Sequence, residues 1–220
     1  MPISPKYHAR FKENCFYHVY NRTNNKEKLF RSNENKRYFM QLFDHYLSPF
    51  IELISWSLLD NHFHFEIKVK SEIEIHKSLS TLPFISLTPT EFKFLKGSIP
   101  ADTLISRAFR KFFQSYTLAF NKYYKRQGNL FHKNFKRIEI RDNKQLLQTL
   151  IYIHRNPQEH GIVSDFREYP WSSWHSFAKP GLQSGWPKKI ISLFGSKNQL
   201  TESHLHAVFQ IESATAFIVI

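Results

Sequence analysis

The segment His62-Phe63-His64 carries two imidazole side chains at a spacing that suits a divalent metal ion. Polar and apolar residues alternate without a break from His62 to Lys70, which predicts a strand with Phe63 facing a core. The two histidines and Glu66 then share the other face of the strand, which we expect to be open. Two histidines on one strand face can hold a metal ion between them. The alternative is two half-exposed histidines on a polar sheet face.

A second pair with the same spacing, His204 and His206, shows that this spacing alone does not indicate a metal site. With 12 histidines in 220 residues, roughly 0.6 such pairs arise by chance. The residues around the second pair predict the start of a helix, on which positions two apart do not face each other. We therefore expect this second pair to be incidental.

A phenol and an amide lie one helical turn apart later in the chain. Asp142 or Asn143 can cap a helix that carries leucine and isoleucine at helical spacing and closes near Gly161. Tyr152 and Asn156 are four residues apart within this helix and therefore share a face of it.

The composition favours a polyanionic partner. Lys and Arg number 31 against 18 acidic residues, a net charge of +13, and the aromatic content is 16%. Such a chain suits nucleic acid, with aromatic rings available for base stacking; the alternative is a generally basic protein. The single Cys15 excludes a disulfide framework and fits a reducing compartment. No signal region or membrane-spanning run is evident, so we expect a cytoplasmic protein, associated with the nucleoid when bound to DNA.

The periodicity predicts an α+β order of elements. We expect one domain over residues 1–180, a long irregular insertion at 71–102, and a C-terminal extension at 181–220 with short helices. Strands are expected at 15–22, 51–59, 62–70 and 135–140, and helices at about 33–47, 103–125 and 142–161.

Five segments, in order, resemble one family. They span roughly residues 10–177 and comprise Tyr17-His18-Val19-Tyr20-Asn21-Arg22, Asn61-His62-Phe63-His64, Ser115-Tyr116 with Gly128-Asn129-Leu130-Phe131, Tyr152-Ile153-His154-Arg155-Asn156-Pro157, and Trp171-Ser172-Ser173. With these motifs the chain resembles the REP-associated tyrosine transposases, which are single-tyrosine HUH transposases of bacterial insertion sequences. One departure is Asp60, where the family often has proline before Asn-His.

The resemblance implies a fold, a site and a reaction. The fold is a ferredoxin-like α+β sandwich with helices on one face of a central antiparallel sheet. The metal ligands are His62, His64 and Asn156, the metal is Mg²⁺ or Mn²⁺, and the nucleophile is Tyr152. The reaction is cleavage and rejoining of single-stranded DNA, at hairpin-forming repeats, through a 5′-phosphotyrosine adduct.

The basic residues and the motif residues near the site give a set of expected DNA contacts. These are His18, Arg22, Lys68, Lys70, Arg110, Lys122, Lys125, Arg126 and Lys133. Tyr116 is a rival nucleophile, but it lies on the apolar stripe of its helix, so we expect it in the core. For His154 and His160 we expect structural or capping roles.

Two other functions remain open on the sequence. A domesticated relative could be a non-catalytic module that binds hairpin DNA or RNA, although it would not need His62, His64, Tyr152 and Asn156 together. A rolling-circle replication initiator or relaxase shares the chemistry but usually carries further domains or a third histidine motif. The sequence does not separate a monomer from a homodimer.

Overall fold

The computed structural model describes residues 7–24, 27–178 and 185–207 of the chain. The boundary expected at residue 180 lies outside these residues. The elements in chain order are β1 (Phe16–Arg22), α1 (Asn33–Leu47), β2 (Ile51–Leu58), β3 (His62–Val69), α2 (Glu72–Ser80), η3 (Phe84–Ser86), α3 (Pro89–Leu95), α4 (Ala101–Tyr123), β4 (Lys136–Ile140), α5 (Asn143–Glu159), η4 (Phe166–Glu168), α6 (Trp174–Ala178), α7 (Gly185–Phe194) and α8 (Lys197–His206).

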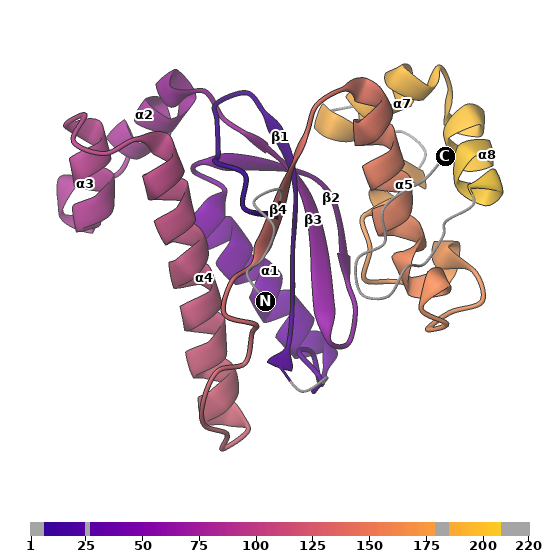
Figure 1. Cartoon of the computed structure of the whole chain (residues 1–220), viewed down its shortest axis with the longest axis horizontal. Coiled ribbons are helices and arrows are strands. Elements are labelled where there is room, and N and C mark those ends of the chain that lie inside the picture. Colours follow the sequence, from indigo (N-terminus) through magenta and orange to yellow (C-terminus); the bar gives the residue numbers. More distant parts are fainter. Residues whose placement is uncertain (1–6, 25–26, 179–184, 208–220) are drawn as a thin grey trace.

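The four described strands form one antiparallel sheet in the order β2-β3-β1-β4 (Figure 1). Together with α1 and α4 they follow the chain order β-α-β-β-α-β, which is the ferredoxin-like arrangement predicted from the sequence. β3 lies inside the sheet, with β2 on one side and β1 on the other. The histidine strand is thus hydrogen-bonded along both edges.

Helices α1 and α4 cover one face of the sheet and enclose the main core. The Ser32 side chain accepts the Asn35 N–H and so starts α1. Phe39 of α1 contacts Phe63 of β3 and Phe112 of α4, with ring centroids 5.2 and 4.6 Å apart. Each buried aromatic ring of this kind contributes about 1.5–3 kcal/mol to stability.

The other face of the sheet is covered too, so the expectation of an open histidine face is wrong. α5 packs across β2 and β3, and His64 is only 5% exposed, while Glu66 is fully buried. A second apolar core, which includes Ile54 of β2 and Leu150 of α5, lies on this side. Figure 1 shows α5, α7 and α8 together on the side of the sheet away from α4. The polar face of β3 is therefore an interior surface.

A chain of buried histidines joins α8 to α5. The Ser173 hydroxyl lies 2.8 Å from His154 Nε2, and His154 Nδ1 lies 3.0 Å from His204 Nε2. His204 Nδ1 lies 2.8 Å from the Leu200 carbonyl, which can only accept a proton, so His204 carries its hydrogen on Nδ1. Each neutral ring can then donate one hydrogen and accept one. The described part of the C-terminal extension thus belongs to the layer that holds α5.

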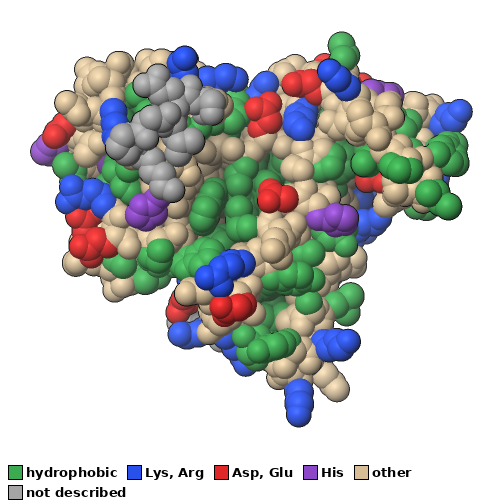
Figure 2. All heavy atoms as spheres, turned by 180° about the vertical axis from the view of Figure 1, so that it is seen from behind, with side chains coloured by type: hydrophobic (Ala, Val, Ile, Leu, Met, Phe, Trp, Pro, Cys, Tyr) green, Lys and Arg blue, Asp and Glu red, His purple; other side chains and the backbone are tan. Residues whose placement is uncertain are grey.

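The segment 71–102 contains helices, in contrast to the irregular insertion that we expected. Ser71 and Glu74 form a capping box at the start of α2, and Thr88 and Glu91 form another at α3. The two helices are short, so their apolar spacing does not repeat often enough to be recognised. Hydrophobic side chains stay exposed on this lobe, at the right in Figure 2, and Ile85 is 95% exposed.

Within the described residues, no helix is long and apolar enough to cross a membrane.

Candidate active site

The histidine pair and the tyrosine-bearing helix meet at the His62 end of β3. The His64 and Tyr152 ring centroids are 5.3 Å apart, and His62 Nε2 lies 3.1 Å from Asn156 Oδ1. The N-terminus of α5 is set by Asp142, whose side chain accepts the Gln145 N–H. The structure therefore brings together the four residues that the resemblance singled out.

The protonation of His62 follows from its neighbours. Its Nδ1 lies 2.6 Å from Asn61 Oδ1, an atom that can only accept, and its Nε2 faces the oxygen of Asn156. Burial lowers the pKa of His62 to about 4, with a smaller contribution from His160, so the ring is neutral near pH 7 and has one hydrogen. One hydrogen therefore serves two acceptor oxygens, so one of the two contacts can be completed by a cation in place of a hydrogen.

His64 is held by a third histidine. His64 Nδ1 lies 2.9 Å from His18 Nε2, and the two rings stack with centroids 5.1 Å apart. Burial lowers the pKa of both rings, that of His18 to about 3. His18, which we expected to contact DNA, instead contacts a candidate metal ligand from within the protein.

Tyr152 is a buried, neutral phenol. It is 8% exposed, and burial raises its pKa to about 12, while a hydrogen bond with the Asn156 side chain lowers the pKa in part. The Asn156 amide therefore contacts the phenol as well as His62. One side chain links the candidate nucleophile to the histidine pair.

The ligand set fits a hard divalent ion. In the described residues no group of three or more His, Cys, Asp or Glu could hold a metal ion, so a site on this histidine pair needs a ligand of another type. The oxygen of Asn156 is such a ligand, and it faces His62 Nε2 at 3.1 Å. Two adjacent ligands of one octahedral Mg²⁺ are separated by about 3 Å. The contact between His62 Nε2 and Asn156 Oδ1 therefore has the spacing of two ligands of one ion.

Asp60, the departure from the family pattern, is ion-paired away from the histidines. Its carboxylate lies 3.0 Å from Lys28 Nζ and 4.0 Å from the buried Lys36. Its carbonyl accepts the N–H groups of Leu29 and Phe30. Asp60 therefore fixes the β2–β3 turn, and its charge is already balanced by two lysines.

Sequence reasoning missed two residues that shape the site. Asn61 orients His62, and the Tyr20 ring contacts both His18 and His64, with centroids 4.8 and 5.5 Å away. The sequence does carry a signal for Tyr20. It lies two residues from His18 and two from Arg22 on β1, so the three side chains share one face of the strand.

The expected DNA contacts separate into those at the site and those elsewhere. Arg22 pairs with His62 across the sheet and is exposed, and exposed Lys133 follows His132, whose N–H donates to the Arg22 carbonyl. Lys68 lies six residues further along β3, about 20 Å from His62. The remaining lysine of this strand end, Lys70, donates to the Ser48 carbonyl.

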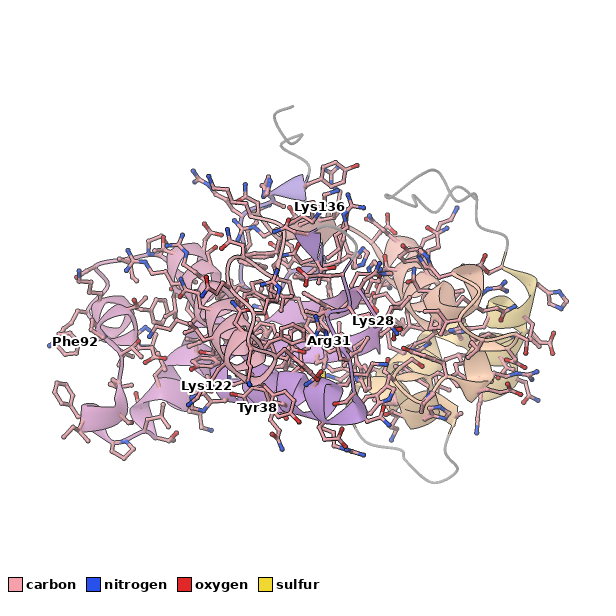
Figure 3. The ribbon with its side chains drawn as sticks, turned by 90° about the horizontal axis from the view of Figure 1, so that it is seen from below. Lys28, Arg31, Tyr38, Phe92, Lys122 and Lys136 are labelled. Carbon is pink, nitrogen blue, oxygen red and sulfur yellow. The ribbon has the colours of Figure 1, made fainter. Side chains whose placement is uncertain are left out.

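The basic residues of α4 lie over the opposite face of the sheet from α5. Arg110 and Lys122 are exposed on this helix, and Lys125 follows it. Figure 3 separates Lys122 from Lys136, which lies on β4, and Figure 2 shows basic side chains distributed over the visible face rather than gathered on it. These residues do not extend the candidate site.

Arg126 holds a loop together. Its guanidinium binds both carboxylate oxygens of Glu27 and also donates to Asn121 Oδ1 and to the carbonyls of Gly128 and Asn129. A guanidinium with its donors engaged in this way joins the segment after β1 to the segment after α4. Arg126 therefore has a structural role, with its guanidinium donors engaged inside the protein.

The other histidines and Tyr116 have the positions expected of them. Tyr116 is 1% exposed, and its hydroxyl donates to the Leu29 carbonyl. His154 is buried in the polar chain to His204. His160 caps α5, although its ring centroid is only 5.0 Å from that of His62.

Glu66 is a buried carboxyl on the same face as the histidines. Ser55 donates to Glu66 Oε2 at 2.8 Å, and Oε1 has no hydrogen-bond partner among the described residues. Burial raises the pKa of Glu66 to about 8. The carboxyl is thus protonated in the folded chain at neutral pH.

Glu66 is expected to make the protein less stable as the pH rises from 4.5 towards 8. Across this window the folded chain keeps a proton that the unfolded chain loses, so the unfolded state gains stability with pH. Between pH 5 and 8 the wild type should lose about 3 kcal/mol of unfolding free energy relative to Glu66→Gln. Urea unfolding of both proteins at the two pH values measures the difference. An equal change in both proteins would show that Glu66 is ionised when folded.

Comparisons with known proteins were made for sequence and for fold. No family model matches the chain. A curated relative from Haemophilus influenzae, described provisionally as a REP-associated tyrosine transposase, is 27% identical over 147 residues, which cover 67% of this chain and 70% of the relative. A solved REP-associated tyrosine transposase bound to a REP hairpin is similar in fold, with a TM-score of 0.54 and 18% identity over 79% of this chain and 84% of that chain.

The fold and the site define a ferredoxin-like α+β protein in which a histidine pair faces a tyrosine-bearing helix. The sequence relative and the fold support the family that the motifs indicate. The chain is similar to the REP-associated tyrosine transposases in sequence and in fold.

Proposed function

We propose that this protein is a metal-dependent transposase that cleaves and rejoins single-stranded DNA at hairpin-forming repeats. The observation that carries the proposal is the meeting of Tyr152 with Asn156 and the histidine pair, in a chain related to REP-associated tyrosine transposases. The solved neighbour is bound to a REP hairpin, which suggests the same class of DNA for this chain.

His62, His64 and Asn156 would hold the metal through two ring nitrogens and one amide oxygen. When bound, Mg²⁺ or Mn²⁺ would withdraw charge from the scissile phosphate and fix its geometry. All three ligands are neutral, so metal binding should be weak until a DNA phosphate adds its negative charge.

Tyr152 would be the nucleophile. Its Oη forms a bond to phosphorus while the bond from phosphorus to the 3′ oxygen breaks, and the phenol proton leaves as the 3′ oxygen takes up another. The products are a 5′-phosphotyrosine adduct and a free 3′-OH. Because the adduct is itself a phosphodiester, a second 3′-OH can reverse the step and join new strands. Asn156 supports this role, because its hydrogen bond to the phenol favours the phenolate.

The proposal is tested with labelled single-stranded DNA from the repeats that flank the gene. The full chain is incubated with this DNA and Mg²⁺ or Mn²⁺, and the products are separated on a denaturing protein gel. A labelled band that migrates with the protein and disappears with EDTA supports the proposal.

The alternative function is hairpin binding without chemistry. Tight binding of the same DNA with no covalent band in either metal would support that function and reject the enzyme. The contacts among His62, His64, Tyr152 and Asn156 favour the enzyme, since a binding surface has no need of this contact set.

Substitution by glutamine should affect DNA binding at Lys133 and stability at Arg126. Lys133→Gln should leave stability within about 0.5 kcal/mol and lower the slope of log affinity for single-stranded DNA against log salt by about 0.7. Arg126→Gln should lower the free energy of unfolding by about 1–3 kcal/mol, because it removes the pairing of Glu27. Urea unfolding and DNA titrations at several salt concentrations measure both. A reduced salt slope in the folded Arg126→Gln protein would contradict the structural role.

A further inference from the structure

His18 contacts a candidate metal ligand without lying on the metal side of it. It belongs to β1, where it pairs with Glu66 across the sheet, and its Nε2 is 2.9 Å from His64 Nδ1. An imidazole has only two nitrogens, so this contact occupies one nitrogen of His64 and leaves Nε2 for any other partner.

We propose that His18 is a positioning residue that accepts the hydrogen of His64 Nδ1 and thereby presents the Nε2 lone pair of His64 to the metal. The inference rests on the proposed function, because it concerns the same metal site. It adds a residue that does not touch metal or DNA to those on which the site depends.

The location of one hydrogen decides whether His64 can be a ligand. A neutral His64 with its hydrogen on Nε2 cannot bind a metal through that atom, whereas the form with the hydrogen on Nδ1 can. An acceptor next to Nδ1 favours the second form. His62 has the same arrangement, since Asn61 Oδ1 lies 2.6 Å from its Nδ1. Both histidines of the pair thus have a nitrogen or oxygen that can accept a hydrogen next to Nδ1.

The ring of His18 is itself held in place. It stacks on Tyr20, with centroids 4.8 Å apart and an angle of 28° between the planes, and it meets the Tyr152 ring edge-on at 5.9 Å. A ring packed in this way keeps its Nε2 directed at His64. The site therefore has an ordered nitrogen next to His64 Nδ1.

Two substitutions separate the acceptor from the packing. His18→Phe keeps an aromatic ring against Tyr20 but removes the acceptor, whereas His18→Gln gives up the ring but restores an acceptor oxygen. Circular dichroism and urea unfolding establish that both variants fold.

The first readout is the position of the His64 hydrogen in the metal-free protein. Long-range ¹H–¹⁵N spectra of histidine-labelled protein distinguish the two forms, and His64→Gln assigns the signal. We expect the hydrogen on Nδ1 in the wild type and in His18→Gln, and a shift towards Nε2 in His18→Phe. A wild-type His64 with its hydrogen on Nε2 would overturn the proposal, and so would an unchanged signal in His18→Phe.

The second readout is Mn²⁺ affinity, measured by electron paramagnetic resonance with intact hairpin DNA in a Tyr152→Phe background, which keeps the scissile phosphate and prevents its cleavage. His18→Phe should weaken Mn²⁺ binding about 10- to 100-fold, and His18→Gln should recover most of the loss. Equal affinities in the wild type and His18→Phe would reject the positioning role. If the wild type binds no Mn²⁺ while His64 carries its hydrogen on Nδ1, the metal site fails and the contact with His18 stands.

Discussion

Tyr152→Phe is expected to form no covalent adduct with single-stranded DNA, a loss of at least about 10³-fold. The substitution removes only the hydroxyl, and the ring keeps its contacts with His18 and His64 at 5.9 and 5.3 Å. The fold and the affinity for hairpin DNA should therefore survive. Single-turnover adduct formation on a denaturing gel, beside a binding titration of the same DNA, measures the two effects separately.

Tyr116→Phe is the matched control for this experiment. It removes the hydroxyl of another buried tyrosine, whose partner is the Leu29 carbonyl in the main core. The cost should be about 1–3 kcal/mol of stability, with adduct formation retained in the folded protein. An adduct that persists in Tyr152→Phe and disappears in Tyr116→Phe would move the nucleophile to the core helix.

Asn156→Asp is expected to bind Mn²⁺ more tightly and yet react more slowly. A carboxylate oxygen in place of an amide oxygen adds a negative ligand, which should tighten Mn²⁺ binding about 10-fold. The same change removes the amide donor that lowers the pKa of Tyr152 and places a charge beside the developing phenolate. Adduct formation should then slow by about 10- to 100-fold at neutral pH.

Asn156→Ala completes this comparison, because it removes the ligand and the donor together. It should weaken Mn²⁺ binding and slow the reaction, so affinity and rate fall together in this variant and move in opposite directions in Asn156→Asp. Calorimetry with Mn²⁺ and single-turnover gels provide the two values for each protein. Weaker Mn²⁺ binding in Asn156→Asp than in the wild type would contradict a ligand at this position.

The sheet and its main helices could be predicted because their signals are local. Alternation over residues 62–70 identifies a strand, and of the two caps expected for the later helix, Asp142 and Asn143, the structure uses Asp142. The helices α2 and α3 were missed because each is short, although the pairs Ser71–Glu74 and Thr88–Glu91 carried a readable capping signal.

The burial of the histidine face could not be predicted from the sequence. Alternation shows which residues share a face, but what covers that face depends on a helix some 80 residues later in the chain. For the same reason Glu66 looked like a solvent-facing carboxylate, and it is fully buried.

The roles of individual polar residues depended on partners distant in sequence. His18 and Arg126 looked like basic groups available to a phosphate, whereas the structure pairs them with His64 and Glu27. Tyr152 and Asn156 could be placed together, because a helix relates residues four apart without tertiary information. The contact of Asn156 with His62 spans 94 residues, and no local pattern contains it.

The candidate site is divided between a strand and a helix whose backbones are held in different ways. His62 and His64 lie on β3, whose backbone is hydrogen-bonded to strands on both sides, so that neither histidine can shift without breaking two ladders. In the described residues, no backbone hydrogen bond joins α5 to the sheet, and the helix is attached to it through the short connection from β4 and through side-chain contacts. If the site adjusts to an incoming DNA strand, we therefore expect α5 to move relative to β3. Tyr152 and Asn156 are on the same helix and would move together, so the hydrogen bond between the attacking oxygen and the Asn156 amide would be kept.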